Sequence, residues 1–263
     1  VILGVAEVEN RKVLEDLIHT DFLKDKKYNI IHYDSPDLRG IDVGFLYQPA
    51  YFNPTHHETF ELKLWDEEGR RDYTRDQLLV SGYLNGELVH IIVNHWPSRR
   101  GGEEASRNKR EKAAYLNTQI IEKIRETDSN AKIIIMGDLN DDPTNTSLKE
   151  VLKTVADKDA VLEGEIYNPT EQMFKNGQNT LVYRDNINFF DQIMVSSTFL
   201  ASDFNYDNFK LYKVMVFNPP YLTTQTGKYK GYPHRSFAGS NFINGYSDHY
   251  PVYMYLIRET IVE

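Results

Sequence analysis

The sequence predicts an α/β (α+β) fold in which two layers of β-sheet form a sandwich with helices on the outside. Three observations favour this fold: several short apolar runs that end in turn residues, a hairpin signal between two of them, and one long amphipathic helix. With 263 residues, 40% of them apolar, the chain can form one large core. No linker rich in Pro, Gly or Ser divides it, so we predict a single domain over residues 1–263.

The predicted strands are spread along the whole chain. They are Val1–Ala6, Ile41–Tyr47, Leu78–Leu84, Glu87–Asn94, Lys132–Met136, Phe190–Val195 and Pro251–Ile257. Asn85-Gly86 separates two of these runs and favours a tight hairpin, because both residues tolerate positive φ. Strands therefore dominate the prediction, and helices fall between them.

Two helices and two long loops complete the prediction. Apolar spacing indicates helices over Asn10–Leu23 and Arg107–Glu126. The segments 165–188 and 205–244 are rich in Tyr, Phe, Asn and Gly and lack a regular period. We expect them to be surface loops, which in compact domains often carry function.

Composition excludes several classes of function. The sequence has no Cys, which excludes disulfides, thiolate zinc sites and cysteine nucleophiles, so any metal must be held by oxygen or imidazole. A net charge of −9 argues against wrapping nucleic acid by bulk charge, and against long duplex DNA bound without sequence preference. A local basic groove remains possible, and a positive strip beside the site would reverse this expectation.

The sequence contains no apolar run of the roughly 20 residues that span a bilayer, so we expect a soluble protein without a membrane span. No signal peptide is present at the start. Because the chain opens on Val1 and already predicts a strand there, we expect it to begin inside a longer gene product, from which a targeting segment can have been removed. The compartment is not assigned.

Several predicted strands end at polar residues that can bind metal or phosphate. These residues are Glu7, Asn94 with His95, Asp138 with Asn140, and Asp248 with His249. Neighbouring strands can bring such ends together at one edge of a sheet. Carboxylates suit a hard cation such as Mg²⁺, a carboxylate can orient or deprotonate water, and a protonated His can stabilise charge on phosphorus.

The motifs, taken in order, resemble the endonuclease/exonuclease/phosphatase family, whose fold is deoxyribonuclease-I-like. They are Ala6-Glu7-Val8-Glu9-Asn10, Asn94-His95-Trp96-Pro97-Ser98, Gly137-Asp138-Leu139-Asn140, Asp191-Gln192-Ile193 and Ser247-Asp248-His249-Tyr250-Pro251-Val252. Each tripeptide alone is weak evidence, whereas five in the right order are strong. The resemblance implies hydrolysis of phosphodiesters or phosphomonoesters that depends on Mg²⁺ or Mn²⁺.

The resemblance also implies roles for individual residues. Glu7 matches the principal metal ligand, and Asp248 matches a carboxylate beside the metal. Asp138 matches the residue that positions or activates water, with Asn140 as its partner toward water and phosphate. His249 matches the histidine at the scissile phosphate, Asp191 the carboxylate that orients it, and His95 a second histidine in phosphate binding or proton donation. Arg75-Asp76 is similar to the family's Arg-acidic pair, which makes Asp76 a candidate to orient His95.

The sequence departs from the family pattern at its start. The family usually begins with a strand that carries an Asn near its end, and nothing precedes Val1 here. We expect this absence to leave an open slot in one sheet with unpaired backbone groups. It also puts activity of the chain as given in question.

Three arginines are candidates to bind substrate. Arg99 lies in the basic segment Ser98-Arg99-Arg100-Gly101-Gly102 directly after His95, where it could seat a phosphate. The alternative for this segment is a solvated charge cluster balanced by Glu103 and Glu104. Arg39 and Arg235 lie in stretches that are similar to bacterial members of the family.

The first functional hypothesis is therefore a metal-dependent phosphoester hydrolase, a nuclease or phosphatase, in which water attacks phosphorus in line. The substrate would be a nucleic acid, a nucleotide or a small phosphoester, and we infer no obligate protein partner. The alternative is a catalytically impaired member that binds a glycan or nucleotide through the Tyr- and Asn-rich loops.

Overall fold

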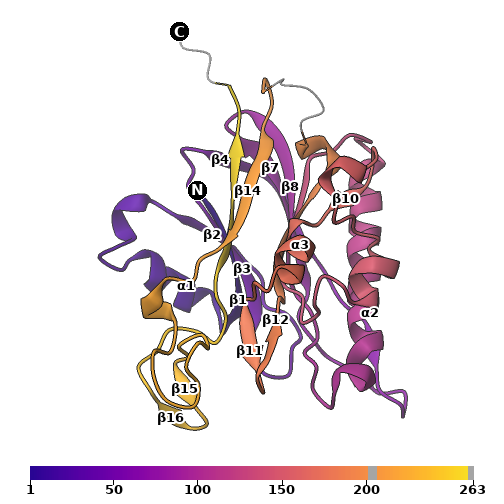
Figure 1. Ribbon diagram of the computed structural model, residues 1–263. Helices are drawn as coiled ribbons and strands as arrows, with labels where there is room; N and C mark the ends of the chain where they lie inside the picture. The colour runs from indigo at the N-terminus through magenta and orange to yellow at the C-terminus, as the bar shows by residue number, and fades with distance from the viewer. Residues whose placement is uncertain (201–205, 260–263) are drawn as a thin grey trace.

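The structure is a computed structural model that describes residues 1–200 and 206–259. Two layers of β-sheet pack face to face, with helices on the outside, as Figure 1 shows. This arrangement confirms the predicted α/β sandwich. None of the helices in the described ranges combines the length and the hydropathy that a bilayer span requires.

The first layer is a six-stranded sheet with the order β10-β13-β9-β8-β7-β4. Its strands are β4 (Phe52–Phe60), β7 (Gln77–Leu84), β8 (Glu87–His95), β9 (Ile133–Asp138), β10 (Ile166–Tyr167) and β13 (Asp191–Ser196). Strands β8 and β9 are parallel, whereas the other pairs are antiparallel. Asn85 and Gly86, with φ of 46° and 87°, form the predicted hairpin turn between β7 and β8.

The second layer consists of two separate sheets. One has the order β1-β3-β2 and the other pairs β14 with β17. The strands are β1 (Ile2–Val8), β2 (Asn29–His32), β3 (Asp42–Tyr47), β14 (Lys210–Val216) and β17 (Val252–Ile257). Among the described residues, β1 and β17 each have one edge without a strand partner. A cavity of about 140 Å³ is lined by β1, the β9–β13 pair, and Pro251 and Val252.

Two helices cover the outer faces of the layers. Helix α1 (Arg11–Ile18) packs Leu14 against the β1–β3 sheet, and its first turn is capped by the side chain of Asn10. Helix α2 (Glu103–Arg125) packs on the six-stranded sheet. It begins four residues before the predicted start, because Glu103 and Glu104 occupy its first turn, where acidic side chains are favoured. Helix α1 ends at Ile18, five residues before the predicted Leu23.

Several elements are missing from the prediction. The segments expected to be loops contain β10, β11 (Leu181–Tyr183), β12 (Asn186–Asn188), β14, β15 (Phe237–Ala238), β16 (Asn241–Phe242) and helix α3 (Pro169–Lys175), while residue 205 lies outside the described residues. Strands β2 and β4 and the short pair β5 (Leu64–Trp65) and β6 (Arg71–Asp72) were also not predicted. Short helical segments occur at Lys24–Lys26, Ser147–Val151, Lys158–Ala160, Ser197–Phe199 and Pro220–Leu222. Strands β4, β10 and β14 pair with strands that are not their neighbours in sequence, a signal that local periodicity does not contain. The hairpins β5–β6, β11–β12 and β15–β16 have only two or three residues in each strand, too few to show a period.

The main core lies between the two layers and is built by strand alternation. On β8, Val89, Ile91 and Val93 face the second layer, whereas Ile92 faces helix α2. Both faces of β8 are therefore buried, and the strand carries His95 at its end in a fixed register.

Candidate active site

Three of the predicted site residues lie side by side across neighbouring strands. His95 is the last residue of β8 and pairs with Asp138, the last residue of β9. Asp138 in turn pairs with Asp191, the first residue of β13. His95 Nε2 lies 3.5 Å from Asp138 Oδ2. The sheet register therefore brings these side chains together at one edge, as the sequence predicts.

Gly137 is required for this register. Its φ is 134°, and a Cβ added there would lie 2.0 Å from the backbone oxygen of Asn94 on β8. Any side chain at this position would force β9 away from β8. The glycine of the Gly137-Asp138-Leu139-Asn140 motif thus allows the close strand approach that sets Asp138 beside His95.

Asn140 is held directly over Asp138. Its backbone N–H donates to Asp138 Oδ1 at 2.9 Å, and its side-chain amide donates to Asp138 Oδ2 at 3.2 Å and to the carbonyl oxygen of Trp96 at 3.0 Å. Its φ of 51° lies in the left-handed region, which asparagine tolerates. The amide of Asn140 is therefore oriented by fixed partners and is buried.

His249 joins the row from the second layer, just before β17. Its Nδ1 lies 2.7 Å from Asp191 Oδ2, so the carboxylate orients the imidazole. Burial lowers the pKa of His249, but the charge and hydrogen bond of Asp191 outweigh burial and, with Asp138 and Asp248, raise it to about 10. The imidazole is therefore held in its cationic form.

The row concentrates negative charge around Asp138. Burial, and then repulsion from Asp191, raises the pKa of Asp138 to about 7. Ligand atoms of Asp138, Asp191 and His249 all lie within 4.8 Å of one another, in a group able to hold a metal ion. A cationic imidazole has no lone pair for a metal, so this group as it stands favours contact with water and phosphate over ligation of a cation.

His95 and Asp76 both have unsatisfied polar atoms. The nitrogen Nδ1 of His95 and the oxygen Oδ1 of Asp76 are buried and have no hydrogen-bond partner within residues 1–200 and 206–259. The β7–β8 register pairs Leu78 with Val93, and extending it by two residues places Asp76 opposite His95. Burial, followed by the charges of Arg75 and Arg39, lowers the pKa of His95 well below its usual value. Its imidazole is therefore neutral, unlike that of His249.

Glu7 lies on the opposite layer in an unusual backbone conformation. It sits at a bulge in β1, between Ala6 and Val8, with a φ of 59°. A bulge re-aims a side chain relative to its strand, and a left-handed φ is costly for a residue with a Cβ. The Glu7 carboxylate is 62% exposed and lies 3.8 Å from Arg39. Within the described ranges, Glu7 does not lie close enough to two other metal-competent side chains to form a three-residue metal site with them.

Asp248 and Arg235 form a second exposed pair. Arg235 Nη2 donates to Asp248 Oδ2 at 3.2 Å, and both side chains are about half exposed. Asp248 precedes His249 directly and contributes to the elevated pKa of that histidine. The two residues predicted to bind metal, Glu7 and Asp248, are thus each partnered by a predicted substrate-binding arginine.

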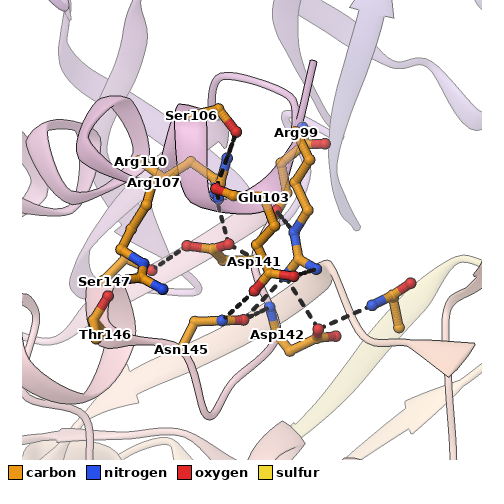
Figure 2. Close-up of polar contacts among 12 residues, drawn as sticks. Arg99, Glu103, Ser106, Arg107, Arg110, Asp141, Asp142, Asn145, Thr146 and Ser147 are labelled. Carbon is orange, nitrogen blue, oxygen red and sulfur yellow. Dashed lines mark hydrogen bonds and ion pairs between the residues drawn. The ribbon is translucent and has the colours of Figure 1, made fainter. Parts of the chain in front are cut away.

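Arg99 makes its contacts inside the protein, as Figure 2 shows. Its Nε donates to the carbonyl oxygen of Asn140, its Nη1 to Glu103, and its Nη2 to Asp141, Asp142 and Asn145. The side chain is only 18% exposed. The geometry favours a role in holding the loop after Asp138 over a role in seating a phosphate.

The same loop is anchored by a buried ion pair that the sequence analysis did not identify. Arg110 on α2 is fully buried and donates to Asp141 Oδ1 at 2.6 Å (Figure 2). Ser147 donates to the other carboxylate oxygen of Asp141 at 2.7 Å. A helical Arg among many charged neighbours carries no local signal for such a contact, although the run of acids after Asn140 could have prompted a search for one.

A second buried ion pair supports His95 and Asn140 from the other side. Arg75 donates to Asp37 Oδ2 at 3.0 Å and also to the carbonyl oxygen of Trp96, the same atom that accepts from Asn140. Both charged side chains are about 5% exposed. Asp37 was missed because it lies in a Pro- and Gly-containing stretch that predicts only a turn.

The chain matches one known protein family by sequence and several solved structures by fold. The Endonuclease/Exonuclease/phosphatase family matches residues 1–258. No curated protein matches the chain by sequence. Among solved structures, the chain is similar to a humanized TDP2 of D. rerio (14% identity, 97% of this chain and 85% of that chain, TM-score 0.60).

Two further structures share the fold. One is a mannosyl-6-phosphatase from Bacteroides thetaiotaomicron (17% identity, 97% of this chain and 85% of that chain, TM-score 0.57). The other is the catalytic domain of human Nocturnin (14% identity, 97% of this chain and 80% of that chain, TM-score 0.54). The sandwich and the family match over nearly the whole length agree: this chain belongs to the Endonuclease/Exonuclease/phosphatase family.

Proposed function

We propose that the protein hydrolyses phosphoester bonds with the help of Mg²⁺ or Mn²⁺. The observation that carries the proposal is the row His95–Asp138–Asp191 with His249 bonded to its end. The known proteins of similar fold include a mannosyl-6-phosphatase and a D. rerio TDP2 complexed with single-strand DNA product, so both monoester and diester substrates are consistent with the fold.

Each residue of the row has a role that its contacts support. His249, oriented by Asp191, would bind a phosphoryl oxygen and stabilise the charge that develops there. Asp138, oriented by Asn140, would hold the attacking water and accept its proton. His95 is neutral, and its Nδ1 has no partner among the described residues. Its imidazole can therefore accept a proton or pass one on, on the side of Asp138 away from Asp191. Asp76, opposite it, would set its orientation.

The exposed carboxylates would hold the cation. Glu7 and Asp248 offer oxygen ligands that are each paired with an arginine, and a hard divalent cation prefers oxygen. When bound, the cation supplies positive charge that offsets the phosphate and the leaving oxygen. Arg39 and Arg235 would then be free to contact substrate oxygens.

The test is hydrolysis of a generic phosphodiester and a generic phosphomonoester with Mg²⁺ or Mn²⁺, with and without EDTA. We expect EDTA-sensitive hydrolysis, and a loss of about 10²–10⁴-fold in kcat for Asp138→Asn or His249→Ala. Matched controls are Asp16→Asn and His56→Ala, which alter exposed side chains on α1 and β4. If the folded wild type hydrolyses neither ester, or Asp138→Asn retains the full rate, the proposal is wrong.

The impaired-binder alternative makes the opposite prediction. A chain that folds, is inactive with both cations, and still binds a nucleotide or glycan would support it. The connected geometry of His95, Asp138, Asn140 and the Asp191–His249 pair favours the enzyme.

A further inference from the structure

An exposed set of aromatic side chains lies in the segment 217–246, between β14 and β17. Seven aromatic residues occur in it, and six of them are more than 40% exposed: Phe217, Tyr221, Tyr229, Phe237, Phe242 and Tyr246. Phe237 and Phe242 face each other on the hairpin β15–β16, with ring centroids 5.3 Å apart. Exposed apolar groups that gather in this way mark a binding surface more often than isolated ones do.

This segment is fixed directly to the candidate site. Arg235, two residues before Phe237, donates to Asp248, the neighbour of His249. The backbone N–H of Tyr246 donates to the carbonyl oxygen of His234 at 2.6 Å. Gly245 packs so closely that a Cβ would lie 2.1 Å from the backbone oxygen of Arg235. The base of the hairpin is therefore held beside Asp248 and His249.

A second hairpin lies at the same end of the molecule. Figure 1 shows β11–β12 and β15–β16 together at the bottom of the view. Tyr232 donates from its hydroxyl to Asp185, in the turn of β11–β12, and accepts from the backbone N–H of the same residue at 2.8 Å. Tyr183 on β11 is also exposed. The hairpin β11–β12 is thus linked to the segment 217–246 through Tyr232.

The charge of this region is opposite to that of the whole chain. Residues 217–246 contain three Lys or Arg and no Asp or Glu, whereas the protein carries a net charge of −9. Lys228 lies 5.4 Å over the ring of Tyr229, and neither it nor Lys230 forms an ion pair with another described residue. A basic, aromatic segment in an acidic protein is suited to a polyanion that carries flat rings.

We propose that the segment 217–246 binds single-stranded nucleic acid that leads into the site, which deepens the proposed function and rests on it. Unpaired bases would stack on Phe237 and Phe242, while Lys228 and Lys230 would contact the backbone phosphates. The cationic charge favours a polyanion over a neutral glycan. Stacking on exposed rings favours a single strand over a duplex, because the bases of a duplex already stack on one another.

Fluorescence anisotropy in EDTA tests this proposal without turnover. The probes are labelled oligothymidylate and oligouridylate of about 12 nucleotides, an abasic oligonucleotide of equal length, and a duplex. We expect Phe237→Ala with Phe242→Ala to raise the Kd for both base-bearing single strands about tenfold or more, and to leave the Kd for the abasic strand unchanged. A lower Kd for oligothymidylate would assign the segment to DNA, and a lower Kd for oligouridylate would assign it to RNA.

The lysines should act on every strand. Lys228→Gln with Lys230→Gln should raise the Kd for the abasic oligonucleotide as well as for the base-bearing ones. The double variant should also reduce the slope of log K against log salt concentration by roughly 1.4. Tyr115→Ala, at an equally exposed ring on α2, is the matched control and should change neither Kd nor slope. If the double phenylalanine variant does not fold, Phe242→Ala alone serves, since its ring is 63% exposed.

The outcomes separate this inference from the proposed function. Base-dependent binding that the phenylalanine variant weakens, in a protein without hydrolase activity, supports the subsite and refutes the hydrolase. Hydrolase activity with an unchanged Kd in that variant refutes the subsite alone. Tight binding of a neutral oligosaccharide that depends on Phe237 and Phe242, without oligonucleotide binding, would assign the surface to glycans and overturn the inference.

Discussion

The two sides of the candidate site differ in how firmly the protein holds them. On the six-stranded sheet, Asp138 and Asn140 are fixed by hydrogen bonds to each other and to Trp96. On the opposite layer, Glu7 and Asp248 are more than half exposed, and among the described residues each pairs with one arginine. We call these the buried half and the exposed half of the site.

The difference fits a division of labour between the halves. Groups that orient water or a proton work best when their direction is fixed before substrate arrives, because no reorganisation is then needed. Carboxylates that take a hydrated cation must instead remain open to solvent and able to change partners. Single substitutions can therefore test the buried half and the exposed half separately.

The largest effect is expected at the ion pair beneath the buried half. Arg110→Ala leaves Asp141 buried without its main partner, so the free energy of unfolding should fall by about 3–5 kcal/mol. Urea denaturation measures the change. Arg107→Ala, at an exposed ion pair three residues earlier on α2, should cost less than about 1 kcal/mol. Equal losses in the two variants would show that Arg110 does not support the loop.

Arg99 distinguishes a structural arginine from a substrate-binding one. Because its guanidinium donates to the Asn140 carbonyl and to Asp142, Arg99→Ala should lower the free energy of unfolding by about 1.5–3 kcal/mol. The kcat should fall more than the KM rises. A higher KM with unchanged stability would instead return Arg99 to the phosphate-binding role that the sequence suggests.

Asp76 gives a pH-dependent effect on stability. Burial and the charges of Glu61 and Asp42 raise its pKa to about 6, so the folded state retains a proton that the unfolded state has already released. Stability should therefore fall as the pH rises from about 4 to 6, and Asp76→Asn should escape this loss, which we expect to be about 1–2 kcal/mol. Thermal unfolding of both proteins at pH 4 and pH 7.5 measures it. If the difference in stability between the wild type and Asp76→Asn is the same at both pH values, the raised pKa of Asp76 is contradicted.

The smallest effect is expected in the exposed half. Glu7 has a left-handed φ that glycine adopts without cost, so Glu7→Gly should change the free energy of unfolding by at most about 1 kcal/mol, toward greater stability. The same variant should lose metal-dependent hydrolysis. Glu7→Ala is the control, since it removes the carboxylate and keeps the strain. A large loss of stability in Glu7→Gly would mean that the carboxylate is structural.

The chain order of the motifs was enough to predict which residues meet, because strand register then fixes the geometry. His95, Asp138 and Asp191 end or begin strands that pair with one another, and His95 and Asp138 were recognised from their positions after apolar runs. On the second layer, Glu7 at a bulge and His249 before β17 were likewise recognised beside apolar runs, whereas Asp191 follows only from the resemblance to the family.

What sequence reasoning missed depends on contacts between distant residues. Strand β14 has few buried residues and is defined by its pairing with β17, about 40 residues away. The partners Arg75–Asp37 and Arg110–Asp141 are separated by 38 and 31 residues. The basic segment after His95 made Arg99 a candidate to bind substrate. In the structure its guanidinium instead donates to Asp141 and Asp142, the acids that follow Asn140.

The most direct test of the central claim is a crystal structure with Mn²⁺ and inorganic phosphate bound. We expect an anomalous difference peak between the two halves, in contact with Glu7 or Asp248, and a phosphate within hydrogen-bond distance of His249. A second group of potential ligands, His32 with Asp34 and Asp42, provides an internal comparison. A peak at that group alone, with no phosphate near His249, would contradict the account.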